Sequence, residues 1–333
     1  MNESWVEKFR PKNLDDVESQ EDIIISLKNC IKTKNLPHLL FFGPSGCGKT
    51  STILALAREI FGQKYWSDRV IELNASDERG IKVVREKIKR YAMNSVSIDP
   101  NIPPWKIIIL DEADNMTSDS QFALRKIMED YSKVTRFCII CNYHNKIIDP
   151  IVSRCSLYRF KPIPKKHIHL KLKNICDAEG STIDNESIEM IEKISRGDLR
   201  KAINFLQRCR NFKNFTNSNI NNINNELIET MSGIIPHKML VEFFEECINK
   251  DSNKVDKMIE NFYHQSYSLT IIIPYILNII IKHKKLSDNV KSLLVQKVLS
   301  IDNFLLNGCD ENIQYNRLAY SIMHYATYDS VDV

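Results

Sequence analysis

The sequence has no apolar stretch long enough to cross a membrane. The nearest candidate, LTIIIPYILNIII at residues 269–281, contains Pro274 and falls short of the roughly 20 apolar residues of a span. It therefore predicts a core helix. The first residues, MNESWVEKFRPKN, contain no apolar segment behind a basic one, so they show no secretory signal. We expect a protein of the cytosol or the nucleus, without membrane segments.

A strong excess of one charge is also lacking, since the formal net charge is only +4. Any affinity for nucleic acid must then come from a local basic patch rather than from the overall field. With 43% hydrophobic and 26% charged residues, the composition is typical of a globular protein. A chain of 333 residues exceeds what one core usually supports, so we expect two or three domains.

The sequence gives little support for disulfides or zinc, although it contains nine cysteines. An odd number of cysteines in a chain without a secretory signal favours free thiols. Cys138 and Cys141 have the CxxC spacing, but they lie in the apolar run RFCIICN, which predicts a strand. Residues three apart on a strand point to opposite faces of the sheet. One metal ion could hardly contact both thiols.

Strand-like and helix-like stretches alternate in the first half of the chain. The apolar runs HLLFFG, VIELNA, KIIILDEAD and TRFCIICN are separated by helix-like stretches such as TSTILALAREIF. This alternation predicts an α/β domain with a parallel sheet that is covered on both faces. After SLYRFKPIPKK the pattern becomes mainly helical, and Pro162 and Pro164 predict a linker. The Asn-rich residues 211–226 predict a second hinge or loop.

The stretch GPSGCGKT, at residues 43–50, fits the P-loop pattern G-x-x-x-x-G-K-[ST] between a strand and a helix. In such a loop, backbone N–H groups surround phosphates at a helix N-terminus, where the helix dipole favours negative charge. Lys49 would reach the β- and γ-phosphates, and the Thr50 hydroxyl would bind Mg²⁺. A chance glycine-rich turn is the alternative. Cys47 is expected to fill space rather than to act in redox chemistry. The expected phosphate-site residues are Gly43, Pro44, Ser45, Gly46, Cys47, Gly48, Lys49, Thr50 and Ser51.

A second stretch, IIILDEAD, predicts a buried strand that ends at two acids, Asp111 and Glu112. Ligands of open α/β sheets bind at this end of the strands. Asp111 would hold Mg²⁺ through water, and Glu112 would accept a proton from the attacking water. The alternative is a pair of solvent-facing acids that cap the strand. RNA helicases share the letters DEAD, but they have a second α/β lobe, whereas the C-terminal half here is helical in pattern.

Several stretches resemble, in the same order, those of the small subunits of replication factor C, the AAA+ sliding-clamp loader. The resemblance is close over residues 4–210, and the C-terminal third is similar mainly in its helical character. GKTSTILAL, NASDERGI and TRFCIICNY are most similar to the small-subunit type called the second in yeast and the fourth in humans. Ser45 and Cys47 depart from the family, which more often has proline and threonine there. The stretches are WVEKFRPKNLDD, NLPHLLFFGPSGCGKTST, ELNASDERGI, IIILDEAD, ALRKIMEDYS, TRFCIICN, IIDPIVSRC and GDLRKAINFLQ.

The resemblance implies an AAA+ nucleotide-binding domain at residues 1–161, a helical lid domain at 162–228 and an all-α collar domain at 229–333 that joins subunits. It also implies that ATP and Mg²⁺ bind at the P-loop. The residues that it places against the adenine and its surroundings are Val6, Arg10, Pro11 and Val17.

Two further residues acquire roles from the resemblance. Asn142, at the end of a predicted strand, corresponds to sensor 1, which orients the attacking water or binds the γ-phosphate. A strand-ending Asn is also a common turn residue, so the pattern alone leaves both interpretations open. Arg200 corresponds to sensor 2. It follows Asp198, a good N-cap, near the start of a predicted helix that would direct a cation toward the phosphates.

The stretch VSRCS, at residues 152–156, places Arg154 between serine and cysteine. From the residues alone, this arginine would cap a helix or bridge Asp149. The resemblance implies instead a finger that enters the ATP site of the neighbouring subunit, where a guanidinium stabilises charge on the transferring phosphoryl group.

Residues 78–90, ERGIKVVREKIKR, predict a helix with one basic and one apolar face. From the pattern alone, a solvated basic face is the ordinary interpretation. The resemblance implies that this helix follows the phosphate backbone of primer–template DNA without reading its sequence. The residues expected to contact DNA are Arg79, Lys82, Arg85 and Lys89.

The function implied is that of an ATP-hydrolysing subunit of a heteropentameric clamp loader in the nucleus. Its partners would be the other subunits, the sliding clamp PCNA and primer–template DNA. One alternative is a subunit that binds ATP for structure while its neighbours hydrolyse it. Lys49 and Glu112 argue against this, because a structural site could dispense with both. A different AAA+ motor is disfavoured by the combination of SRC with WVEKFRP.

Overall fold

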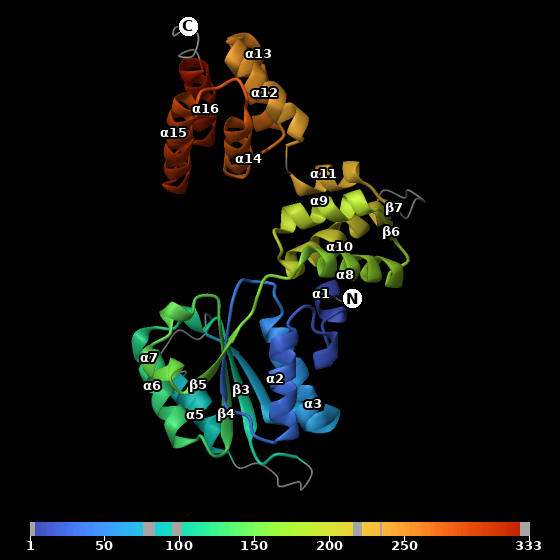
Figure 1. The fold of residues 1–333 in the computed structure, drawn as a ribbon, viewed down its shortest axis with the longest axis vertical. Helices are drawn as coiled ribbons and strands as arrows, with labels where there is room; N and C mark the ends of the chain where they lie inside the picture. Colours follow the sequence, from blue (N-terminus) through green and yellow to red (C-terminus); the bar gives the residue numbers. More distant parts are fainter. Residues whose placement is uncertain (1–3, 76–83, 95–101, 216–221, 234, 327–333) are drawn as a thin grey trace. The chain divides into compact units, whose positions relative to one another are not determined.

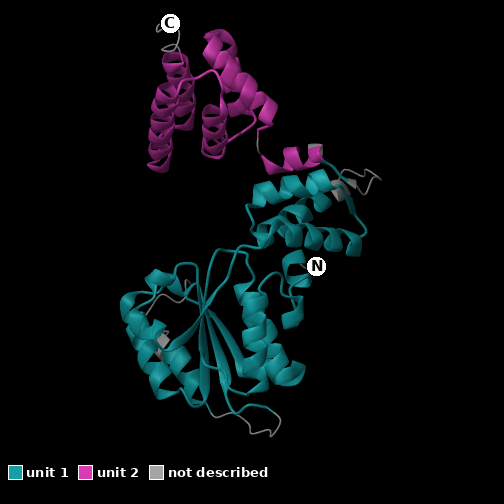
Figure 2. Cartoon of the chain, viewed as in Figure 1, with its two compact units in different colours: residues 1–224 teal, residues 225–333 magenta. Residues whose placement is uncertain are grey.

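The computed structural model describes residues 4–75, 84–94, 102–215, 222–233 and 235–326 (Figure 1). The chain divides into two compact units, residues 1–224 and 225–333, which are described separately (Figure 2). Among the described residues, no helix has the length and apolar character to span a membrane.

The first unit is built on a five-stranded sheet with the strand order β2-β3-β4-β1-β5, and all of its pairings are parallel. Because the strands are parallel, their carboxyl ends lie at the same edge of the sheet. The P-loop follows β1, Asp111 ends β3 and Asn142 follows β4, and these three strands are neighbours in the sheet. The strands are β1 (His38–Phe42), β2 (Val70–Asn74), β3 (Lys106–Asp111), β4 (Thr135–Cys141) and β5 (Cys155–Arg159).

Helices cover both faces of this sheet, with α2 and α3 on one side and α5, α6 and α7 on the other (Figure 1). On the first face, Leu27 and Phe61 pack with the strand residue Phe41. On the second, Leu124 packs with Leu40. The α/β prediction with a covered parallel sheet is therefore confirmed. These helices are α2 (Glu21–Lys32), α3 (Lys49–Arg69), α5 (Lys89–Met93), α6 (Ser118–Asp130) and α7 (Asp149–Val152), and the shorter turns are η1 (Leu14–Asp16), η2 (Val84–Ile88), η3 (Ala113–Asn115) and η4 (His144–Lys146).

The CxxC pair is divided between these two faces. Cys138 belongs to the cluster under α2 and α3, and Cys141 to the cluster under α6. All nine cysteines are free thiols, and the described residues contain no group of His, Cys, Asp or Glu side chains that could hold a metal ion. The predicted opposite orientation of the two thiols is confirmed.

The remainder of the first unit is a helical layer that includes the start of the chain. Ile168, Leu172, Ile191 and Leu206 are buried within it. The first helix packs on α10, and the Trp5 backbone N–H donates to Gln207 Oε1 at 3.0 Å. The elements are α1 (Trp5–Lys8), α8 (Lys165–Ala178), β6 (Thr182–Ile183), α9 (Asn185–Ser195), α10 (Leu199–Phe215) and β7 (Asn222–Ile223).

The second unit is all helical in its described part. Phe243, Phe262, Leu294 and Leu318 are buried in its core. Residues 269–281 lie within α14, and five of its apolar side chains are buried, which confirms the predicted core helix. The domain boundaries expected at residues 161 and 228 remain predictions. The helices are α11 (Asn225–Ser232), α12 (His237–Asn249), α13 (Ser252–His264), α14 (Leu269–Lys282), α15 (Asp288–Leu306) and α16 (Glu311–Tyr325).

Candidate active site

The P-loop connects β1 to α3 through a turn that only glycine fits at two positions. Gly43 has φ 149° and Gly46 has φ 68°, which are conformations that residues with a side chain rarely adopt. A Cβ at Gly43 would lie 2.4 Å from the Phe160 carbonyl oxygen, and one at Gly46 would lie 1.9 Å from Asp198 Oδ1. The loop therefore packs closely against its surroundings and leads directly into the N-terminal end of α3.

Lys49, the first residue of α3, is nearly buried inside this loop. Its ammonium group donates hydrogen bonds to the carbonyl oxygens of Gly43 and Pro44, both at 2.7 Å, and to Asn142 Oδ1 at 3.1 Å. Asn142 follows β4, the neighbour of β1 in the sheet. The pairing brings together the P-loop lysine and the expected sensor 1 residue.

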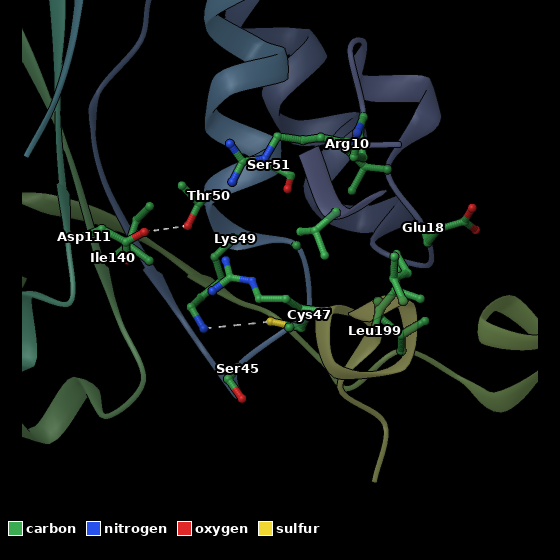
Figure 3. A pocket seen from close by; sticks show the side chains of 18 of the residues that line it. Arg10, Glu18, Ser45, Cys47, Lys49, Thr50, Ser51, Asp111, Ile140 and Leu199 are labelled. Atoms are coloured by element: carbon green, nitrogen blue, oxygen red, sulfur yellow. Dashed lines mark hydrogen bonds between the residues drawn. The ribbon is translucent and has the colours of Figure 1, made fainter. Parts of the chain in front are cut away.

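Cys47 also lies inside the loop, with its Sγ 4.0 Å from Lys49 Nζ (Figure 3). Burial raises the pKa of this thiol, and the nearby Lys49 charge only partly opposes that effect. A thiol that resists ionisation is a poor nucleophile and metal ligand. This environment suits the space-filling role expected for Cys47.

Thr50 and Asp111 meet at the edge of the sheet, where the Thr50 hydroxyl donates to Asp111 Oδ2 at 2.7 Å (Figure 3). The other carboxylate oxygen of Asp111 accepts the backbone N–H of Glu112 at 2.8 Å. A hydroxyl next to a carboxylate supplies the oxygen ligands that Mg²⁺ prefers. The two predicted metal residues are therefore in direct contact.

Glu112 has a left-handed backbone, with φ 53° and ψ 38°. This conformation is strained for a residue with a side chain, and such strain concentrates at functional sites. The side chain is exposed, and its Oε2 accepts a hydrogen bond from Asn115 Nδ2 at 3.3 Å. Glu112 thus leaves the end of β3 with an accessible carboxylate, as a general base requires.

A pocket joins these groups to the helical layer and to the start of the chain. Thr50 and Asp111 lie on one side of it, and Glu18 and Leu199 lie on the other (Figure 3). The lining includes the expected residues Val6, Arg10, Pro11, Val17, Ser45, Gly46, Cys47, Gly48, Lys49, Thr50, Ser51, Asp111, Glu112, Asn142 and Arg200.

Sequence reasoning missed about a third of the lining. Leu199 and Ile203 flank Arg200 at helical spacing, and this spacing could have identified them. Lys171 could not be found in this way, because its position depends on how α8 packs. Its Nζ lies 3.7 Å from Glu18 Oε1. The missed residues are Phe9, Glu18, Ile140, Cys141, Ile163, Lys171, Leu199 and Ile203.

Arg154 does not line this pocket, as far as the described residues show. Its guanidinium donates to the Pro150 carbonyl oxygen at 2.8 Å and forms an ion pair with Glu129. Arg125 also binds Glu129, and the two arginines lower the pKa of that carboxyl group, with the hydrogen bond from Arg125 as the largest cause. Within this chain Arg154 therefore caps α7, and its acidic partner is Glu129 rather than Asp149.

The expected DNA-contacting residues fall mostly outside the described residues. Arg79 and Lys82 lie outside them, as does the side chain of Arg85. Lys89 begins α5 and is exposed, while the preceding Ile88 is buried. Contact of this segment with DNA remains a prediction.

Comparison with known proteins shows relatives along almost the whole chain. Replication factor C subunit 4 of Homo sapiens is 42% identical over 323 residues, which cover 96% of this chain and 87% of that protein. Replication factor C subunit 2 of Saccharomyces cerevisiae is 42% identical over 325 residues, which cover 96% and 92%. The chain belongs to the replication factor C small-subunit family. The similarity to these two subunits confirms the subunit type expected from the sequence.

Family and fold comparisons agree with this assignment. Residues 235–321 match the replication factor C C-terminal domain, and residues 19–164 match the family described as DNA polymerase III, delta subunit. The solved structure of the Thermotoga maritima RuvB Holliday junction branch migration motor is 19% identical, has a TM-score of 0.54, and matches 71% of this replication factor C chain and 80% of its own. This likeness shows the AAA+ fold, which is of the ATPase type.

Proposed function

We propose that this chain is an ATP-hydrolysing subunit of a replication factor C clamp loader in the nucleus. The assembly would open the sliding clamp PCNA and close it around primer–template DNA. The observation that best supports this proposal is the contact between Thr50 and Asp111 beside Lys49, in a chain related to replication factor C subunits over 96% of its length. This contact supports the proposal, because it brings a hydroxyl and a carboxylate, the kinds of group that bind Mg²⁺, next to the loop with the P-loop pattern.

The residues present fit ATP and Mg²⁺. The close packing at Gly43 and Gly46 gives the loop the shape that backbone recognition of phosphates requires. Lys49 Nζ already donates hydrogen bonds to three oxygen atoms, so phosphate oxygens can replace these acceptors. When bound, Mg²⁺ supplies positive charge that offsets charge developing on the phosphoryl oxygens. Thr50 and Asp111 are the residues that would hold it.

The chain's own acids and amides supply the rest of the chemistry. Glu112 accepts a proton from a water molecule at the open edge of the sheet, a role that contributes about 10²–10⁴-fold to rate. Asn142, tied to Lys49, orients that water or binds the γ-phosphate. Arg200 enters the pocket from α10 and adds a second cation.

A test of hydrolysis separates the proposal from a purely structural ATP site. Glu112→Gln keeps the shape of the side chain but removes its basicity. In an assembled complex whose other P-loops are inactivated, we expect Glu112→Gln to retain ATP binding while turnover falls about 100-fold or more. The same complex with Glu112 intact is the reference. If it binds ATP without hydrolysing it, the structural alternative is favoured.

The DNA proposal is supported by the exposed Lys89 at the start of α5 and by the basic residues before it. Replacing Arg79, Lys82 and Arg85 with alanine should weaken binding of the assembled complex to all DNA sequences equally. The log–log salt slope should become shallower by about 0.9 for each phosphate that is no longer neutralised. A slope equal to that of the wild type would contradict DNA binding by these residues.

A further inference from the structure

Asp198 connects the P-loop to the helix that carries Arg200. Its Oδ2 accepts a hydrogen bond from the Ser45 hydroxyl at 2.8 Å. Its Oδ1 accepts the backbone N–H of Lys201 at 3.0 Å, and its carbonyl oxygen accepts the N–H of Ala202 at 3.0 Å. One carboxylate therefore caps α10 and holds a P-loop side chain 153 residues away in sequence.

The surroundings of Asp198 leave this carboxylate little freedom. The residue is only 8% exposed. Gly46, next to Ser45, approaches so closely that a Cβ there would lie 1.9 Å from Oδ1 and 2.4 Å from Cγ of Asp198. Two consecutive P-loop residues thus pack against the capping side chain. A small shift of the P-loop must move either this side chain or the first turn of α10.

Arg200 lies in that first turn, two residues after the cap, and lines the nucleotide pocket with Leu199 and Ile203. The direction of a side chain in the first turn depends on where the helix begins. We propose that Asp198 is a positioning residue, which holds Arg200 in register with the P-loop through the Ser45 hydroxyl. This inference rests on the proposed ATP-binding function of the pocket and adds a connection between its two walls.

The Ser45 hydroxyl supplies the P-loop side of this connection. A side chain without a hydroxyl, such as alanine, would offer Asp198 no hydrogen-bond donor at this position. The hydroxyl adds a charge-assisted hydrogen bond to a nearly buried carboxylate, which is stronger than a bond between neutral groups. The position of α10 relative to the P-loop should therefore depend on Ser45 here.

The test uses the full chain. It measures the ADP/ATP ratio, which is the dissociation constant for ADP divided by that for ATP, because a cation directed at the γ-phosphate strengthens the binding of ATP alone. Ser45→Ala should lower this ratio about three- to tenfold, the size expected for one partly exposed charge-assisted bond. Ser45→Thr, which keeps a hydroxyl, should restore it. In an Arg200→Ala background, Ser45→Ala should have no further effect on the ratio.

A matched pair of cap variants separates positioning from simple helix capping. Asp184 caps the neighbouring α9 by accepting the N–H of Ser187 at 2.6 Å. Asp184→Ala and Asp198→Ala each remove a cap and should lower the melting temperature, but only Asp198→Ala should lower the ADP/ATP ratio.

An unchanged ratio in Ser45→Ala, or an equal loss with and without Arg200, would overturn the positioning role. Lys49→Ala distinguishes this failure from that of the underlying function. If Lys49→Ala loses ATP binding while Ser45→Ala matches the wild type, only the positioning inference fails. If Lys49→Ala binds ATP normally, the proposed function fails with it.

Discussion

Lys49 illustrates how single side chains organise the pocket at the residue scale. Its ammonium group is nearly buried, yet three oxygen atoms surround it, two from the P-loop backbone and one from Asn142. A buried cation is tolerated only when it is well hydrogen-bonded. The arrangement keeps the ammonium group at the place where we propose that phosphates bind.

Replacing Lys49 with alanine should weaken nucleotide binding by about 100-fold, because about 3 kcal/mol of charge-assisted hydrogen bonding to phosphates is lost. Titration with a fluorescent ATP analogue measures the dissociation constant. Lys193→Ala, an exposed lysine on α9 of the same unit, serves as the control for the removal of a positive charge. Equal affinity of Lys49→Ala and the wild type would remove the P-loop assignment.

His38 makes the stability of the first unit depend on pH. Its Nδ1 accepts a hydrogen bond from the backbone N–H of Phe137 at 3.1 Å, so this ring nitrogen carries no proton. Burial, assisted by the charge of Arg136, lowers the His38 pKa to about 4. The folded state then binds fewer protons than the unfolded state between about pH 6.5 and pH 4. Stability is therefore lost as the pH falls through this range.

We expect the wild type to lose roughly 2 kcal/mol more stability than His38→Asn between pH 7.5 and pH 5, since Asn Oδ1 can replace Nδ1 as acceptor without titrating. All three tryptophans, at positions 5, 66 and 105, lie in the first unit, so tryptophan fluorescence during urea unfolding reports on that unit. Parallel pH profiles for the two proteins would exclude His38 as the titrating group.

At the scale of elements, Gln121 ties α6 to the segment after β4. It is 3% exposed, donates to the carbonyl oxygens of Lys146 at 3.0 Å and Met116 at 3.3 Å, and accepts the N–H of Ile148 at 2.9 Å. Through Ile148, which precedes α7, it fixes the start of the segment that carries Arg154. The Gln121 side chain thus satisfies backbone groups of a segment that has no hydrogen bonds of a helix or sheet at those positions.

Gln121→Ala should lower the melting temperature markedly, because it leaves three backbone groups without their buried or partly buried hydrogen-bond partner, at a cost of about 2–4 kcal/mol. Gln314→Leu, in α16, is the matched control. Its amide oxygen is also buried but makes no hydrogen bond within the described structure, so its removal should change stability by less than about 1 kcal/mol. Thermal unfolding followed by circular dichroism measures both variants, and equal shifts would contradict the role of Gln121.

The contrast between Gln121 and the P-loop shows which features the sequence could predict. Strands, the P-loop and the acids after β3 were predictable, because an apolar run or a short motif determines them locally. The contacts of Gln121 with Ile148 and of Asp198 with Ser45 were not, since a polar residue inside or before a helix has many possible partners. Only the packing of the elements selects one.

At the scale of the whole molecule, Arg154 lies apart from the pocket of its own chain, so any role in hydrolysis would require an assembly of several chains. Arg154 follows α7 and is held by Pro150 and Glu129, apart from the pocket lined by Lys49 and Asp111. Its ion pair with Glu129 is exposed to solvent, and exposed ion pairs contribute little to stability. Loss of this ion pair therefore costs little, which is compatible with the role that we propose for Arg154 at the site of a neighbouring subunit.

We expect Arg154→Ala to leave ATP binding at this chain's own P-loop nearly unchanged but to slow hydrolysis at the adjoining site about 10³-fold, or about 4 kcal/mol of barrier. The measurement needs an assembled complex in which only the adjoining subunit keeps a working P-loop. Arg159→Ala, an exposed arginine at the end of β5, is the control. Unchanged turnover in Arg154→Ala would leave this residue with the helix-capping role alone.

The strand order of the sheet also determines when β1 can pair with its neighbours during translation. Strand β1 lies between β4 and β5 in the sheet, and the residues of both neighbours emerge from the ribosome long after it. At about 5–20 residues per second, the chain between residues 42 and 135 takes roughly 5–20 s to translate. During that interval HLLFF is an apolar strand without either neighbour, and it is exposed to aggregation. Nascent chains stalled before residue 135 should be cleaved by protease at this strand, whereas chains extended well beyond residue 159 should be protected.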